Sequence, residues 1–187
     1  MKVFVNCITA FRVALAFLII PCFIFELFGI AFFLFLVAAI SDFFDGYLAR
    51  KYNVSTKLGA VMDHTADKFL IAIVSILIAI FWPEWPVSVP IILMICRDLY
   101  VSSLREFAGA QKMELPVGFG GKIKTVAQMV ALGGLLLTIW IIPFAAEDVS
   151  YDLWTASAVA LWVALGFSLL SAGLYTKGFV KKLLKSK

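Results

Sequence analysis

The sequence has few charged residues. Asp, Glu, Lys and Arg make up only 15% of the 187 residues and histidine occurs once, whereas 63% of the residues are hydrophobic. Soluble domains have roughly a quarter charged and about half apolar residues. So much apolar surface requires a bilayer rather than a larger core, and it predicts an integral membrane protein. Because no soluble basic domain is present, we do not expect nucleic-acid binding.

Cysteine is also scarce. The three cysteines are irregularly spaced and all lie in apolar segments, so they predict neither a disulfide framework nor a zinc site. A cleavable signal pattern is missing too, because the first apolar stretch runs on without a small-residue cleavage motif and further apolar stretches follow. We therefore expect residues 1–187 to form a single membrane domain.

Long apolar runs are abundant. A membrane-spanning helix needs about 20 mostly apolar residues, and six stretches meet this requirement. Their approximate ranges are 8–26, 30–50, 58–82, 87–107, 123–143 and 153–175. The residues before the first stretch, 1–7, are expected to form a short helix at the membrane interface. The predicted fold class is all-α, with six transmembrane helices.

Basic residues are unevenly distributed among the connections. The first, third and fifth connections contain no Lys or Arg, whereas the second and fourth are basic and residues 176–187 form a basic C-terminal tail. Because basic connections remain cytosolic, we expect both termini on the cytosolic side of a bacterial inner membrane. The net charge of +4 also suits anionic lipid headgroups.

Four aspartates form the most informative chemical pattern. Asp42 and Asp45 are three residues apart in the second predicted helix, and Asp63 and Asp67 are four apart in the third. Each pair shares a helix face, and the two helices form a hairpin, so we expect the four carboxylates to meet near the cytosolic surface. Four ionised carboxylates in a low-dielectric pocket repel one another, so they require bound cations. All-oxygen ligands suit Mg²⁺ or Mn²⁺.

Small residues and an arginine continue the same helix faces. Gly46, Ala49 and Gly59 leave room for a bulky ligand, and Arg50 offers a planar fork for phosphate, so a pyrophosphate-containing substrate fits. A purely structural interpretation is weaker, although single aspartates and glycines can serve helix packing. A metal- or proton-coupled transporter is the alternative of another class. It is expected to hold its carboxylates near the midplane rather than at one basic end.

The complete pattern over residues 42–67, D-x-x-D-G-x-x-A-R-x8-G-x3-D-x3-D, resembles the motif of the CDP-alcohol phosphatidyltransferases at every fixed position. The resemblance implies a six-span, homodimeric enzyme of phospholipid biosynthesis that uses two divalent cations and displaces CMP from a CDP-linked lipid with an alcohol. It implies one metal bound by Asp42, Asp45 and Asp63, a second bound by Asp42, Asp63 and Asp67, and Asp67 as general base. It implies that CDP-diacylglycerol is bound by Thr9, Gly46, Arg50, Thr56 and Gly59.

A second group of charges concerns the acceptor alcohol. Arg97 and Arg105 are eight residues apart in the fourth predicted helix and share a face, and Lys122 and Lys124 begin the fifth. Cations in a membrane helix are costly unless they pair or bind an anion. For the lysines, snorkelling to the interface is an open alternative. Asp98 follows Arg97 directly, but adjacent residues on a helix do not face each other, so their pairing is also open.

Three further stretches resemble the phosphatidylglycerophosphate synthases of that family: residues 6–12 (N-C-I-T-A-F-R), 97–106 (R-D-L-Y-V-S-S-L-R-E) and 121–128 (G-K-I-K-T-V-A-Q). Asp98 is a departure, because Glu is usual there. The resemblance implies sn-glycerol 3-phosphate as the acceptor, with its phosphate bound by Arg97, Arg105, Lys122 and Lys124. Inositol phosphate, serine and phosphatidylglycerol stay open as other acceptors.

Overall fold

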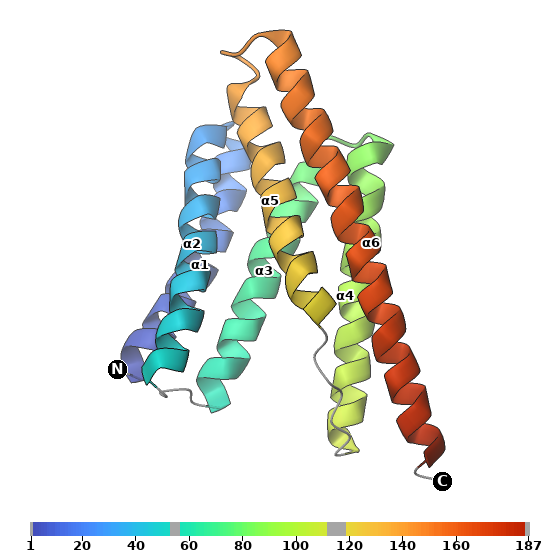
Figure 1. The fold of residues 1–187 in the computed structure, drawn as a ribbon. Coiled ribbons are helices and arrows are strands. Elements are labelled where there is room, and N and C mark those ends of the chain that lie inside the picture. Colours follow the sequence, from blue (N-terminus) through green and yellow to red (C-terminus); the bar gives the residue numbers. More distant parts are fainter. Residues whose placement is uncertain (1, 53–56, 112–118, 186–187) are drawn as a thin grey trace.

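Six helices make up the described chain. The computed structural model describes residues 2–52, 57–111 and 119–185, with side chains described within 10–41, 65–66, 68–111 and 124–184. The helices are α1 (Lys2–Ile24), α2 (Phe28–Tyr52), α3 (Lys57–Phe81), α4 (Trp85–Ala110), α5 (Phe119–Ile141) and α6 (Glu147–Lys185). They form an elongated bundle with both chain termini at the same end (Figure 1).

The six predicted apolar stretches all form helices, so the all-α fold class is confirmed. By length and apolar composition, three helical segments are able to cross a membrane: Trp85–Ala110, Lys124–Ile141 and Glu147–Leu184. The apolar parts described in α1, α2 and α3 are shorter, at Ala10–Ile24, Phe28–Ser41 and Lys68–Phe81. The long apolar helices identify the chain as an integral membrane protein.

The first and last helices differ from the prediction. The expected separate helix over residues 1–7 is not confirmed, because α1 is continuous from Lys2 to Ile24. At 1.5 Å per residue, the 39 residues of α6 extend about 58 Å, whereas the hydrocarbon core of a bilayer is roughly 30 Å thick. The last predicted span ends near residue 175 because apolarity stops there, whereas Lys and Leu, which favour helix, continue α6 to Lys185.

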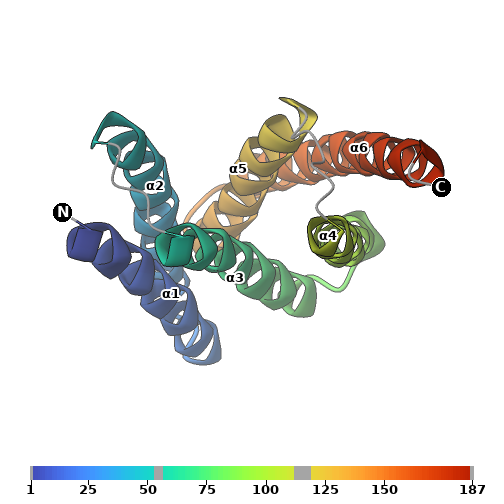
Figure 2. The ribbon, with the colours of Figure 1, turned by 90° about the horizontal axis from the view of Figure 1, so that it is seen from below.

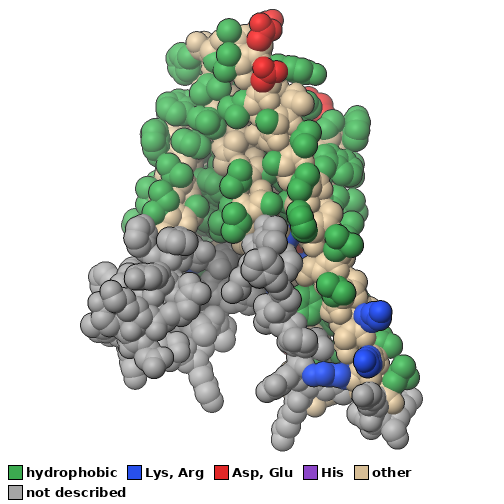
Figure 3. Space-filling model, viewed as in Figure 1, with side chains coloured by type: hydrophobic (Ala, Val, Ile, Leu, Met, Phe, Trp, Pro, Cys, Tyr) green, Lys and Arg blue, Asp and Glu red, His purple; other side chains and the backbone are tan. Residues whose placement is uncertain are grey.

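A continuous apolar core holds the bundle together. Helix α1 packs against α2 and α3, and α6 packs against α4 and α5. The fully buried side chains include Ile19, Leu70, Leu132 and Leu161. Large apolar side chains also cover much of the outer surface (Figure 3), as expected where helices face lipid. Seen along the bundle, α3 lies between α1 and α4 (Figure 2), and it packs against both of them and against α5.

The two ends of α6 carry described side chains of opposite charge. Acidic side chains lie at the upper end in Figure 3, where α6 begins with Glu147 and Asp148, and basic side chains lie on the lower part of α6. The exposed lysines there include Lys177, Lys181 and Lys182. The lower end also holds the adjoining ends of α2 and α3 (Figure 1). The aspartate motif and the basic end of α6 therefore lie at the same end of the molecule.

Candidate active site

The aspartate motif lies on two consecutive helices. Asp42 and Asp45 are in the last three turns of α2, and Asp63 and Asp67 are in the first three turns of α3. Both segments are helical, so the backbone places the two aspartates of each pair on the same face of their helix, as predicted. The side chains of these four aspartates lie outside the part of the chain whose side chains are described. Their roles as metal ligands and general base stay predictions.

The other residues of the motif are placed by their helices alone. Thr9 is on α1, Gly46 and Arg50 are on α2, and Gly59 is on α3, all with side-chain positions that fall outside the described part; Thr56 lies in the segment 53–56, which is also outside it. Among the side chains that are described, no group of three or more His, Cys, Asp and Glu residues is placed to hold a metal ion. The motif carboxylates are not among those side chains, and a set of carboxylate oxygens fits a hard divalent cation.

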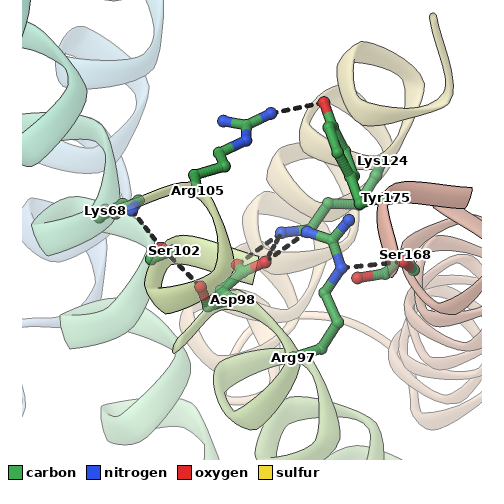
Figure 4. Close-up of polar contacts among 8 residues, drawn as sticks. All are labelled: Lys68, Arg97, Asp98, Ser102, Arg105, Lys124, Ser168 and Tyr175. Carbon is green, nitrogen blue, oxygen red and sulfur yellow. Dashed lines mark hydrogen bonds and ion pairs between the residues drawn. The ribbon is translucent and has the colours of Figure 1, made fainter. Parts of the chain in front are cut away.

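Charged side chains from α4 and α5 meet at one carboxylate (Figure 4). Arg97 donates from Nη1 to Asp98 Oδ1 over 2.8 Å, and from Nε to the main-chain oxygen of Ser168 on α6 over 2.9 Å. Lys124 on α5 donates from Nζ to both carboxylate oxygens of Asp98, each at 2.5 Å. The Arg97 and Lys124 side chains are only 9% and 7% exposed. Two predicted phosphate-binding cations are thus brought together by Asp98.

These contacts settle two alternatives that the sequence left open. Lys124 does not snorkel to an exposed position, because its ammonium group is buried against Asp98. Arg97 and Asp98 do pair, although adjacent helical residues point about 100° apart. The arginine side chain is long enough to reach back across that angle. Lys122 is on α5 as well, but its side chain lies outside the described part and its role stays a prediction.

Arg105 points toward the same neighbouring helix as Arg97. It donates from Nη2 to the Tyr175 hydroxyl over 2.5 Å, and its guanidinium carbon lies 4.7 Å from the centre of the Tyr175 ring. Tyr175 is on α6, seven residues after Ser168, so the predicted shared face of Arg97 and Arg105 is confirmed. The ring and hydroxyl together hold a guanidinium in a fixed place.

Lys68 is a cation of this region that was not predicted from the sequence. It follows Asp67 on α3, and its Nζ donates to Ser102 Oγ on α4 over 2.6 Å. Ser102 Oγ in turn donates to the main-chain oxygen of Asp98 over 2.6 Å. Its position in an apolar helix, directly after a motif aspartate, was a signal from which a functional role could have been predicted. The motif helix α3 is therefore bonded to α4 at the turn that holds the Arg97 and Lys124 cations.

The cluster of Lys68, Arg97, Asp98 and Lys124 carries more positive than negative charge. Arg97 and Lys124 pair with the Asp98 carboxylate, and Lys68 from a third helix bonds to Ser102, four residues further along α4. An uncompensated cation in or beside a membrane is costly, so the cluster favours binding of an anion. Phosphate accepts hydrogen bonds from both ammonium and guanidinium groups. This region is therefore suited to bind a phosphate beside the helix that carries Asp63 and Asp67.

Known proteins similar to this chain agree with that chemistry. A family model described as CDP-alcohol phosphatidyltransferase matches residues 2–170. A CDP-diacylglycerol–glycerol-3-phosphate 3-phosphatidyltransferase of Shigella flexneri serotype 5b is 41% identical over 139 residues, which cover 72% of this chain and 74% of that protein. A protein of the same name from Escherichia coli strain K12 is 39% identical over 138 residues, with the same coverage.

Proposed function

Since the chain belongs to the CDP-alcohol phosphatidyltransferase family, we propose that it transfers the phosphatidyl group of CDP-diacylglycerol to sn-glycerol 3-phosphate. The products are phosphatidylglycerol phosphate and CMP, so the enzyme acts in phospholipid biosynthesis. Relatives at 41% and 39% identity that are named for this reaction support the proposal. The observation that carries the choice of acceptor is the buried pair Arg97 and Lys124, because an acceptor with a phosphate supplies the anion that this pair favours.

The reaction exchanges one phosphorus–oxygen bond for another. A hydroxyl oxygen of glycerol 3-phosphate attacks the phosphatidyl phosphorus, and the bond from that phosphorus to the CMP oxygen breaks. Asp67 accepts the hydroxyl proton as general base. Thr9, Gly46, Arg50, Thr56 and Gly59 bind the CDP-diacylglycerol. Because both reactants are bound and oriented, much of the rate enhancement comes from positioning and charge stabilisation.

The acceptor is held by its phosphate. Arg97, Arg105, Lys122 and Lys124 bind the phosphate oxygens, so that one of the two free hydroxyls extends toward Asp67. The bond from Lys68 to Ser102 supports this arrangement, because it ties the helix of Asp67 to the helix of Arg97. An acceptor without a phosphate would leave these cations with Asp98 as their only described anionic partner, which is the basis of discrimination.

Two divalent cations, Mg²⁺ or Mn²⁺, complete the site. Asp42, Asp45 and Asp63 would hold one, and Asp42, Asp63 and Asp67 would hold the other. The chemistry of the donors supports this proposal, since carboxylates at helical spacing on α2 and α3 provide only oxygen ligands. When bound, the two cations would supply positive charge to the pyrophosphate and to the departing CMP.

The proposed membrane arrangement follows from the charges at the two ends. All six helices cross the bilayer of a bacterial inner membrane, with both termini and the active site on the cytosolic side and the first turns of α1 at the interface. The acidic first turn of α6 and the exposed lysines on its lower part support this orientation. We also propose that two copies form a homodimer, as the family resemblance implies.

A panel of acceptors tests the function. Purified protein receives CDP-diacylglycerol, Mg²⁺ or Mn²⁺, and one acceptor at a time: sn-glycerol 3-phosphate, inositol phosphate, serine or phosphatidylglycerol. We expect glycerol 3-phosphate to give the fastest CMP release. Faster turnover with serine or another acceptor would contradict the acceptor assignment. Metal uptake into vesicles without any CMP formation would contradict the reaction class.

A further inference from the structure

Asp98 takes no part in the proposed chemical step, but it contacts two of the cations proposed to bind the acceptor phosphate. Among the residues whose side chains are described, it is the only carboxylate paired with Arg97 or Lys124. Its side chain is 27% exposed, whereas those two cations are 9% and 7% exposed. The carboxylate therefore lies on the more accessible side of the pair. A phosphate that binds the two cations has to approach them beside Asp98.

The bonds of Asp98 fix the positions of both cations. Lys124 is held by two hydrogen bonds to the carboxylate, and Arg97 is held between Asp98 and the main-chain oxygen of Ser168. The turn that carries Asp98 is itself bonded through Ser102 to Lys68 on α3. The result is a chain of contacts from the motif helix through α4 to α5 and α6 (Figure 4).

Such fixation matters for anion binding because Lys and Arg side chains are long and flexible. Ordering each of them on binding costs conformational entropy, and a pair that is already ordered avoids this cost. Without an intervening carboxylate, two neighbouring cations also repel each other and move apart. Asp98 removes both obstacles before the acceptor arrives.

We propose that Asp98 is a positioning residue for the acceptor. It holds Arg97 and Lys124 as a preformed pair of donors at a set place relative to α3, so that the acceptor phosphate binds without reordering them. The proposal deepens and rests on the proposed function, because it takes the bound phosphate to be that of the acceptor. Asp98 itself neither accepts the hydroxyl proton nor contacts the CDP-lipid.

The chain offers a matched pair of variants. Asp98→Asn removes the charge and keeps the shape, whereas Asp98→Glu keeps the charge. Glu106→Gln is the control, because Glu106 follows Arg105 as Asp98 follows Arg97 but is exposed, and Arg105 bonds to Tyr175. We expect Asp98→Asn to raise KM for glycerol 3-phosphate by about tenfold or more, while KM for CDP-diacylglycerol stays within about twofold. The glutamate variant and the control stay close to wild type.

Anion binding without turnover gives an independent readout. Inorganic phosphate should raise the Tm of wild-type and Glu106→Gln protein, and should raise that of Asp98→Asn less. If Asp98→Asn does not fold, Ser102→Ala replaces it. That variant removes the anchor of Lys68 and should raise KM for the same substrate by a smaller factor.

The outcomes separate the two proposals. If Asp98→Asn binds phosphate as tightly as wild type or more tightly, Asp98 only competes with the anion, and the positioning role is wrong. If Asp98→Glu loses as much as Asp98→Asn, the carboxylate charge is not what positions the pair, and the proposal is also wrong. If wild-type protein does not use glycerol 3-phosphate but still binds phosphate through this pair, the proposed function fails instead.

Discussion

The aspartate motif and the cation cluster are assembled from the sequence in different ways. All four aspartates come from one hairpin, α2 and α3, and helical periodicity alone puts them on common faces. The cluster joins residues from three helices and is bonded to a fourth, α6, and its bonds connect positions 26, 34 and 71 residues apart in the chain. The motif is therefore a local feature, and the cluster depends on how the helices pack. A substitution in the cation cluster can therefore alter acceptor binding without altering the carboxylates of the aspartate motif.

If the two regions act separately, removing divalent metal should affect only one of them. We expect a chelator to abolish CMP release completely, and added Mg²⁺ or Mn²⁺ to restore it, because the motif carboxylates depend on cations. The rise in Tm caused by inorganic phosphate should persist in the chelator. Loss of phosphate binding together with activity would show that the cluster also needs the metal.

The proposed base gives the next largest effect. Asp67→Asn should lower kcat by about 10²- to 10⁴-fold, the usual contribution of a positioned acid or base. Binding of glycerol 3-phosphate, followed by thermal shift, should be retained. Asp148→Asn at the opposite end of the bundle serves as the control. A near-normal kcat for Asp67→Asn would mean that another group accepts the proton.

Removing a cation of the cluster should affect the acceptor alone. Lys124→Met should raise KM for glycerol 3-phosphate by about 30-fold, the equivalent of roughly 2 kcal/mol lost with one member of a buried charge pair. Steady-state kinetics should show little change in KM for CDP-diacylglycerol. Lys181→Met, an exposed lysine on α6, should match wild type. An equal rise in both KM values would place Lys124 at the donor lipid instead.

Arg105 should give the smallest of these effects. Arg105→Lys keeps the charge but loses the planar fork, so KM for glycerol 3-phosphate should rise by about threefold to tenfold. Tyr175→Phe keeps the ring beneath the guanidinium and removes only its hydroxyl partner, so its effect on the same KM should be smaller. A larger effect from Tyr175→Phe than from Arg105→Lys would make the contact with α6, rather than phosphate binding, the main role of Arg105.

The sequence was most informative where structure is local. Apolar runs predicted six helices, and aspartate spacing predicted common faces on α2 and α3, because both depend only on helix geometry. The true end of α6 was not predicted, since a helix does not have to stop where a membrane does. The pairing of Lys124 with Asp98 depends on how α4 packs beside α5, and no spacing along a single helix contains that information.

The bond from Arg97 to Ser168 has a mechanical consequence. Its acceptor is a main-chain oxygen, so no substitution of the Ser168 side chain removes it. The contact instead depends on where the backbone of α6 lies along α4. A slide of α6 by one helical turn would carry that oxygen about 5.4 Å away and release the guanidinium. The direction of the Arg97 side chain thus depends on the register of α4 and α6. A bound acceptor that needs this arginine in place would resist any such slide.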